Sequence, residues 1–244
     1  MSNILKNQNS IFTFFLVSIS IFSFILVAYL ILYPNNLGTK FALHDFLVAS
    51  TFIAVCLFGA IASVYPKTCG KIFSWKLIKT TNNLHSTKSN FKSHHYPCKS
   101  FLNHILKVGK NYLCATCTGL LIGAIFGITG TIVYFYGNFQ INGILFLVPF
   151  GIIFLSYGLF QSLIPKMEGP LARLFAGILL VLGSYIMLIS LDIAGSSTFI
   201  SLFFIVISIF WVYTKIHLSQ REHRKICLNC SKKLCNCSEK ITYY

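Results

Sequence analysis

The sequence predicts an all-α, polytopic membrane protein with about six transmembrane helices and a small zinc-ribbon-like loop on the cytoplasmic side. Of the 244 residues, 55% are apolar and only 10% are charged, whereas about 25% are charged in an ordinary soluble domain. The apolar residues also gather in runs close to the length of about 20 residues that an α-helix needs to cross a bilayer. This composition excludes a soluble globular enzyme, a disordered chain and a secreted disulfide-rich mini-protein.

Each long apolar run predicts one transmembrane helix. The first run is longer than the apolar region of a signal peptide, which has about 7 to 15 residues, so it predicts a retained helix. The division gives an N-terminal helix pair (1–65), a basic cytoplasmic Cys/His loop (66–118), a four-helix segment (112–213) and a basic Cys-rich tail (214–244). The six runs are 11–33, 46–65, 112–136, 143–164, 171–194 and 197 to about 213.

The distribution of basic residues predicts the orientation, because loops rich in Lys and Arg stay in the cytoplasm. Six spans place 19 of the 20 Lys and Arg residues on one side, if Arg173 extends its side chain to that side, and leave only Lys40 on the other. We therefore expect a multi-pass protein of the cell membrane with both termini in the cytoplasm. The basic face is expected to contact anionic lipid headgroups as well as the bilayer itself.

The predicted spans carry no ionisable residue near their middles, which argues against an ion-coupled transporter. Gln161 is expected to hydrogen-bond between helices, and Cys56 to pack as a small apolar residue. Three glycines at four-residue intervals predict a face on the third run that packs closely against another helix of the chain: Gly119, Gly123 and Gly127.

The basic loop contains a pattern of potential metal ligands. His95 and Cys98 are followed, after fifteen residues, by Cys114 and Cys117, which gives the spacing H-x2-C-x15-C-x2-C. This is the spacing of a two-knuckle zinc ribbon with one Cys replaced by His. The intervening segment 105–113 predicts a short β-hairpin with a type II′ turn at Gly109, which would bring the two ligand pairs together.

Three alternatives remain open for this loop. Cys114 and Cys117 are also spaced to share one face of the first turn of the third helix without binding metal. His94 is an alternative to His95 as the first ligand. The residues that could replace a missing ligand are His85, His104 and Cys69.

The C-terminal tail contains a second group of cysteines, with the spacing C-x2-C-x4-C-x-C. Thiolates in so compact a group can wrap one metal ion, Zn²⁺ or Cu⁺, although the same thiols are equally compatible with a flexible basic tail. His217 and His223 are possible additional ligands. The four cysteines are Cys227, Cys230, Cys235 and Cys237.

The junction of loop and helix resembles a family of small polytopic membrane proteins of bacteria and archaea, a domain of unknown function. Its members share a CH…P.RSF segment followed by a CxRCxG motif that opens a transmembrane helix. Residues 94–101 (HHYPCKSF) and 114–119 (CATCTG) are similar to these two parts. His94 stands in place of the family's Cys, Thr116 in place of its Arg, and the first segment is one residue shorter. The resemblance implies a metal or thiol site at this junction and lends no activity.

These observations lead us to expect a non-enzymatic integral membrane protein with a structural Zn²⁺ site and a cytoplasmic interaction surface, whose protein partner the sequence does not identify. No nucleic-acid recognition motif is present, so we expect no nucleic-acid partner. Two alternatives are a thiol-dependent membrane enzyme, acting in redox chemistry or acyl transfer, and a metal transporter or sensor.

Overall fold

The computed structural model describes residues 2–33, 41–64, 104–108, 111–137, 144–164 and 169–228. This part of the chain is mainly helical, and five of its helices are long and apolar enough to cross a membrane. A sixth apolar segment, Leu147–Leu163, is shorter. The helices are α1 (Ser2–Leu32), α2 (His44–Val64), α4 (Ala115–Tyr136), α5 (Ile144–Phe160), α6 (Pro170–Ile193) and α7 (Thr198–Leu228).

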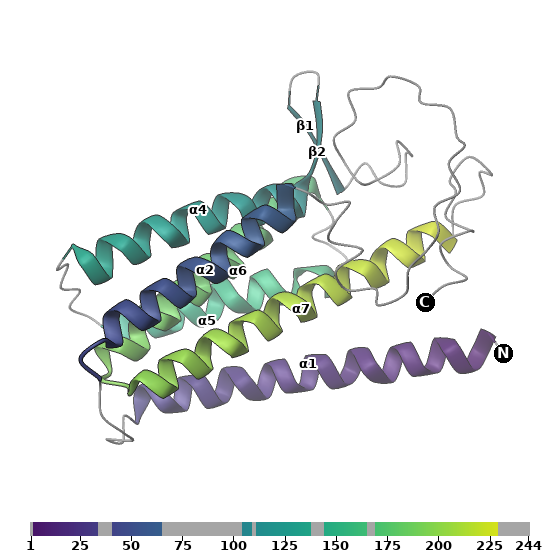
Figure 1. Cartoon of the computed structure of the whole chain (residues 1–244). Coiled ribbons are helices and arrows are strands. Elements are labelled where there is room, and N and C mark those ends of the chain that lie inside the picture. The colour runs from purple at the N-terminus through teal and green to yellow at the C-terminus, as the bar shows by residue number, and fades with distance from the viewer. Residues whose placement is uncertain are drawn as a thin grey trace, which may run out of the picture.

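Successive helices run in opposite directions along the bundle (Figure 1). One end carries the start of α4 and the β-hairpin β1–β2, and we call it the hairpin end. The other carries the short turn between α6 and α7, and we call it the turn end. The first residues of α1 and the last of α7 lie at the hairpin end, on the same side as the start of α6.

The hairpin predicted between the two ligand pairs is confirmed. Strand β1 (Ile105–Val108) pairs with β2 (Asn111–Cys114) in antiparallel register, with Ile105 opposite Cys114 and Val108 opposite Asn111. The turn residues 109 and 110 lie outside the described residues. The predicted helix start at residue 112 is wrong, because residues 111–114 pair with β1 and α4 begins only at Ala115.

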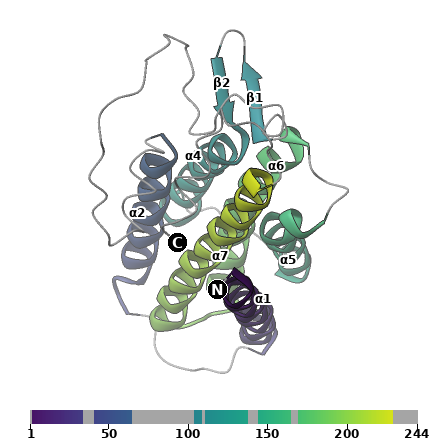
Figure 2. The ribbon, with the colours of Figure 1, turned by 90° about the vertical axis from the view of Figure 1, so that its right-hand side faces the viewer.

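Helix α6 packs along both α4 and α5 (Figure 2). The predicted glycine face of α4 makes the first of these contacts: a Cβ atom on Gly119 would overlap the carbonyl oxygen of Leu174, and one on Gly123 would lie 3.1 Å from the Cα of Ile178. On α6, a Cβ on Gly177 would lie 2.8 Å from the backbone nitrogen of Leu120. Small residues therefore bring the two backbones together, as expected for helices in a membrane.

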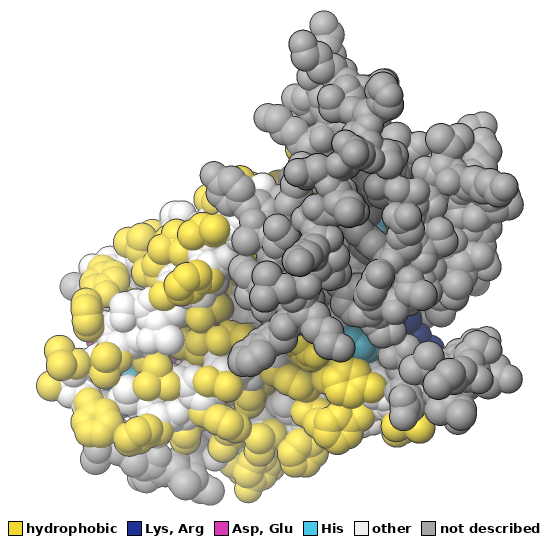
Figure 3. All heavy atoms as spheres, turned by 45° about the vertical axis from the view of Figure 1, so that its right-hand side comes forward, with side chains coloured by type: hydrophobic (Ala, Val, Ile, Leu, Met, Phe, Trp, Pro, Cys, Tyr) yellow, Lys and Arg dark blue, Asp and Glu magenta, His cyan; other side chains and the backbone are white. Residues whose placement is uncertain are grey.

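Large apolar side chains cover much of the outside of the bundle (Figure 3). Phe14 of α1 and Phe58 of α2 are 75% and 74% exposed. A soluble protein rarely exposes contiguous apolar surface on this scale, whereas lipid tails would cover it. The apolar exterior and the five spans together indicate a membrane-embedded protein.

Helix α7 is longer than the sequence indicated. The prediction ended it near residue 213, but the helix continues to Leu228. It is held against α1 by buried polar contacts: the indole N–H of Trp211 donates to Ser23 Oγ at 2.8 Å, and Ser20 Oγ donates to Thr214 Oγ1 at 3.4 Å. The polar residues that follow residue 213 lower the hydropathy of the sequence, but they do not end the helix.

Candidate functional site

The predicted loop site is only partly within the described residues. Cys114 ends β2 and caps α4, and Cys117 lies in the first turn of α4. Cys114 is buried and Cys117 is half-buried. The other two predicted ligands, His95 and Cys98, lie outside the described residues, as do the alternatives His94, His85 and Cys69.

The strand-to-helix junction orders Cys114 and Cys117 as a pair. Pairing of β2 with β1 fixes the backbone of Cys114 opposite Ile105, and the helix then places Cys117 three residues further on. The hydroxyl of Thr118 donates to the carbonyl oxygen of Cys114 at 2.9 Å. The backbone N–H groups at the start of a helix and its dipole favour negative charge, which suits thiolates here.

His104, the one alternative ligand that the structure describes, is buried directly before β1. The structure does not gather it with Cys114 and Cys117 into a group of three potential ligands. Among the described residues, such a group is found only at the turn end.

The tail site lies almost wholly outside the described residues. Cys227 is within the last turn of α7, and Cys230, Cys235 and Cys237 follow beyond the described chain. The ring of His217 packs edge-on against Phe12 of α1, with ring centroids 5.0 Å apart. His217 precedes Cys227 by ten residues, which corresponds to roughly 15 Å along the helix.

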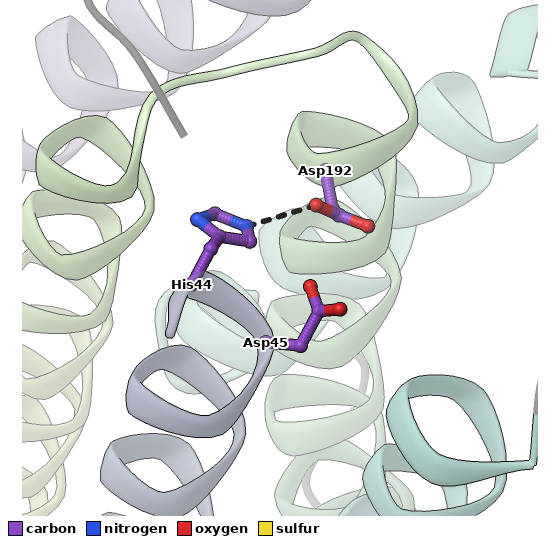
Figure 4. Close-up of side chains that lie close together, drawn as sticks. All are labelled: His44, Asp45 and Asp192. Carbon is purple, nitrogen blue, oxygen red and sulfur yellow. Dashed lines mark hydrogen bonds and ion pairs between the residues drawn. The ribbon is translucent and has the colours of Figure 1, made fainter. Parts of the chain in front are cut away.

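The turn end holds a polar cluster that the sequence analysis missed. His44 and Asp45 open α2, and Asp192 lies in the last turn of α6. The three side chains point toward one another (Figure 4), and one potential ligand atom from each lies within 4.8 Å of the other two. His44 is 3% exposed, Asp192 is partly buried and Asp45 is exposed.

Hydrogen bonds fix the orientation of two of these side chains. His44 Nε2 lies 2.9 Å from Asp192 Oδ1, and His44 Nδ1 lies 2.9 Å from Thr198 Oγ1. Tyr134 donates its hydroxyl proton to Asp192 Oδ2 at 2.9 Å. Because an ionised carboxylate only accepts hydrogen bonds, Nε2 carries a proton in this arrangement. The imidazole therefore donates to the carboxylate, and the cluster joins α2, α4, α6 and α7.

The turn between α6 and α7 positions the cluster. Gly195 adopts a φ of 78°, a conformation that glycine adopts without the steric cost other residues meet. Its N–H donates to the carbonyl of Asp192 at 3.0 Å, and the N–H of Ser196 donates to that of Leu191 at 3.1 Å. This compact helix ending brings Thr198, the first residue of α7, beside His44.

A signal for this cluster was present in the sequence. His44 and Asp45 lie just before the second run and Asp192 lies near the end of the fifth, so none of them is near the middle of a span. In an alternating bundle, the start of the second span and the end of the fifth lie on the same side.

The hairpin end also differs from expectation. Arg173 does not extend to the surface: it is 4% exposed, and its Nη1 donates to Glu222 Oε2 at 2.7 Å. Lys215 of α7 is also buried, and its Nζ donates to Ser162 Oγ at 3.2 Å and to Gln161 Oε1 at 3.5 Å. Gln161 does hydrogen-bond between helical segments, as predicted.

No protein-family model, curated protein or solved structure matches this chain.

Proposed function

We propose that this chain is a multi-pass protein of the cell membrane in which a structural zinc ion orders a basic cytoplasmic interaction surface. In this proposal the hairpin end faces the cytoplasm and both termini lie there. The distribution of Lys and Arg supports the orientation, since 19 of the 20 lie in segments assigned to that end. The sequence similarity of residues 94–101 and 114–119 to the membrane-protein family described above supports assignment to that family.

The observation that carries the zinc proposal is the placement of Cys114 and Cys117 where a hairpin meets a helix. Two sulfur ligands from one turn are half of a tetrahedral zinc site. Antiparallel pairing brings the start of β1 beside Cys114. Cys98 is seven residues before Ile105, a length that spans up to about 23 Å when extended. Cys98 and His95 are therefore within reach as the other two ligands.

A zinc ion at this point would connect the basic loop directly to the bundle. Cys117 is two residues from Gly119, where α4 meets the backbone of α6. A loop fixed there would present its lysines at a defined height above the membrane, in reach of anionic headgroups or an acidic protein surface. The proposed role is therefore that of a scaffold, with the metal supplying rigidity and no chemistry.

Metal analysis of the protein purified in detergent tests the proposal. We expect wild-type protein to retain about one zinc ion per chain at the loop, and Cys117→Ser to lose it, because a structural site needs four ligands. Cys56→Ser is the matched control, since Cys56 is buried within α2 and should not affect zinc content. Cys230→Ser reports separately on the tail, where loss of a further ion would establish a second site.

Two results would contradict the scaffold proposal and favour its alternatives. Protein that binds no zinc and whose Cys114 or Cys117 is rapidly alkylated would favour a thiol-dependent membrane enzyme. Zinc uptake into sealed proteoliposomes containing the protein would favour a transporter.

A further inference from the structure

We propose that His44, Asp45 and Asp192 form a binding site for a divalent transition-metal cation at the turn end, separate from the cysteine site. His44 and Asp45 lie at the start of α2 and Asp192 lies at the end of α6, and the three side chains face one another (Figure 4). The proposal goes beyond the scaffold function and does not depend on it, because it uses none of the same residues.

The donor set defines the class of ion. One imidazole nitrogen and two carboxylate oxygens suit Zn²⁺, Mn²⁺ or Co²⁺ better than the soft Cu⁺ ion, which prefers sulfur. Three protein ligands leave at least one coordination position for water. Asp45 is exposed, so an ion could reach the three side chains from the side of Asp45.

The neighbours of the cluster are those that a metal site requires. A histidine that binds metal through one nitrogen usually donates its other N–H to an acceptor, and its carboxylate partners are hydrogen-bonded in turn. Here Nδ1 of His44 is held by Thr198 Oγ1 at 2.9 Å, which leaves Nε2 directed at Asp192. Tyr134 holds Asp192 Oδ2 at 2.9 Å, which leaves Oδ1 directed at His44. His44 and Asp192 therefore each keep one atom anchored and present the other to the site, whereas Asp45 is held by no hydrogen bond among the described residues.

His44 and Asp192 need only a small adjustment to share one ion, and the carboxylate of Asp45 has to close in from within 4.8 Å. His44 Nε2 and Asp192 Oδ1 are 2.9 Å apart, whereas two ligands on one zinc ion at bonds of about 2.1 Å are roughly 3.4 Å apart in a tetrahedron. Binding through Nε2 requires the proton there to leave while Nδ1 carries the one proton of the neutral ring and donates it to Thr198 Oγ1, and it requires Nε2 and Oδ1 to separate by roughly half an ångström. Protons and the cation then compete for Nε2, so the affinity falls as the pH falls.

Local charge also favours a cation. The carboxylates of Asp45 and Asp192 approach each other, and Asp192 lies at the C-terminal end of α6, where the helix dipole is negative. Of the three ligands, only His44 can carry positive charge, and it lies at the N-terminal end of α2, where the dipole opposes that charge. A divalent cation would neutralise both carboxylates and let His44 stay neutral.

Cobalt(II) titration of chelator-treated protein in detergent tests this site. Cysteine ligands give Co²⁺ a thiolate charge-transfer band, whereas imidazole and carboxylate ligands give only ligand-field bands, so the two proposed sites are read separately. We expect Asp45→Asn to weaken the binding that lacks the charge-transfer band by roughly a hundredfold, since loss of even an outer contact costs about 10- to 100-fold. Among the described residues Asp45 makes no hydrogen bond or ion pair, so the variant should fold normally.

Glu168→Gln is the matched control, because it removes one carboxylate from the connection between α5 and α6 and should leave Co²⁺ affinity unchanged. His44→Gln should abolish the same binding. Equal Co²⁺ affinity in wild type, Asp45→Asn and His44→Gln would overturn the proposal and leave the cluster a hydrogen-bonded contact between helices. Absence of the thiolate band alone would overturn the cysteine site and not this one.

Discussion

At the hairpin end of the bundle, Arg173 donates to Glu222 at 2.7 Å, whereas at the turn end His44 donates to Asp192 at 2.9 Å. Both pairs join α6 to another helix, α7 at the hairpin end and α2 at the turn end, and each buries its basic member more deeply than its acid. The difference lies in what the basic group can do. An imidazole can release its proton near neutral pH, but a guanidinium stays charged.

This comparison shows how the two ends respond to loss of a carboxylate. If Asp192 loses its charge, a neutral imidazole at His44 can still hydrogen-bond to it. If Glu222 loses its charge, Arg173 stays charged and buried, close to Lys215, which interacts electrostatically with both residues. The turn end can therefore adapt, while the hairpin end depends on its one described acid.

The largest effect is expected from Glu222→Gln. The variant leaves the charge of Arg173 buried without an opposite charge, and breaking a buried pair in this way costs about 3 kcal/mol. The free energy of unfolding, measured by denaturant titration in mixed micelles, gives this cost. The double variant Arg173→Met with Glu222→Gln should recover most of the loss, and a loss from Glu222→Gln of well under 1 kcal/mol would show that solvent already screens the pair.

The same chemical change at the other end, Asp192→Asn, should cost about 1.5 kcal/mol. The amide can accept from Tyr134 and donate to neutral His44, so the contacts survive without the charge. The same unfolding measurement compares the two amide variants directly. An Asp192→Asn cost equal to or above that of Glu222→Gln would contradict the idea that the imidazole adapts.

A smaller effect is expected from Tyr134→Phe. The variant removes one hydrogen bond to Asp192 Oδ2, but Asp192 is partly exposed and water can replace the donor, so the cost should be about 1 kcal/mol. Tyr136→Phe is the control, because Tyr136 is an exposed tyrosine on the same helix. Both variants are compared in the presence of a chelator, which removes any contribution of bound metal.

The smallest effect is expected from Lys215→Met. Burial of the ammonium and its repulsion from Arg173 oppose its two long hydrogen bonds and its attraction to Glu222. An apolar side chain of similar length should therefore change stability by less than about 1 kcal/mol. Thermal unfolding in detergent would detect a larger change. A marked loss of stability would assign Lys215 a structural role comparable to that of Glu222.

Much of the fold was predictable because its signals are local. Apolar run length predicted the helices, and Gly109-Lys110 between two short apolar segments predicted the hairpin that forms between Ile105 and Cys114. The helix boundaries at residues 112 and 213 were wrong because strand pairing and tertiary contacts decide them. The length of the fourth apolar run did not indicate that its apolar helix, Leu147–Leu163 among the described residues, is shorter than the other five.

The polar clusters were not predictable from local patterns. His44 and Asp192 are 148 residues apart, and their pairing follows from how α2, α6 and α7 pack. Arg173 was correctly assigned to the hairpin end, but its partner Glu222 lies in a segment that the sequence analysis had placed beyond the last helix. For the cysteine site, the predicted pair Cys114 and Cys117 has a defined place, and its partners remain a prediction.

The contact between α4 and α6 has a further consequence for movement. Close contacts recur about once per turn, where Gly119, Gly123 and Gly127 of α4 meet Leu174, Ile178 and Val181 of α6. A slide of α4 along α6 by a fraction of a turn would bring side chains against the opposing backbone at these points, so the close contacts fix the register of the two helices. The hydrogen bond from Tyr134 to Asp192 joins the same two helices at the turn end and holds that register.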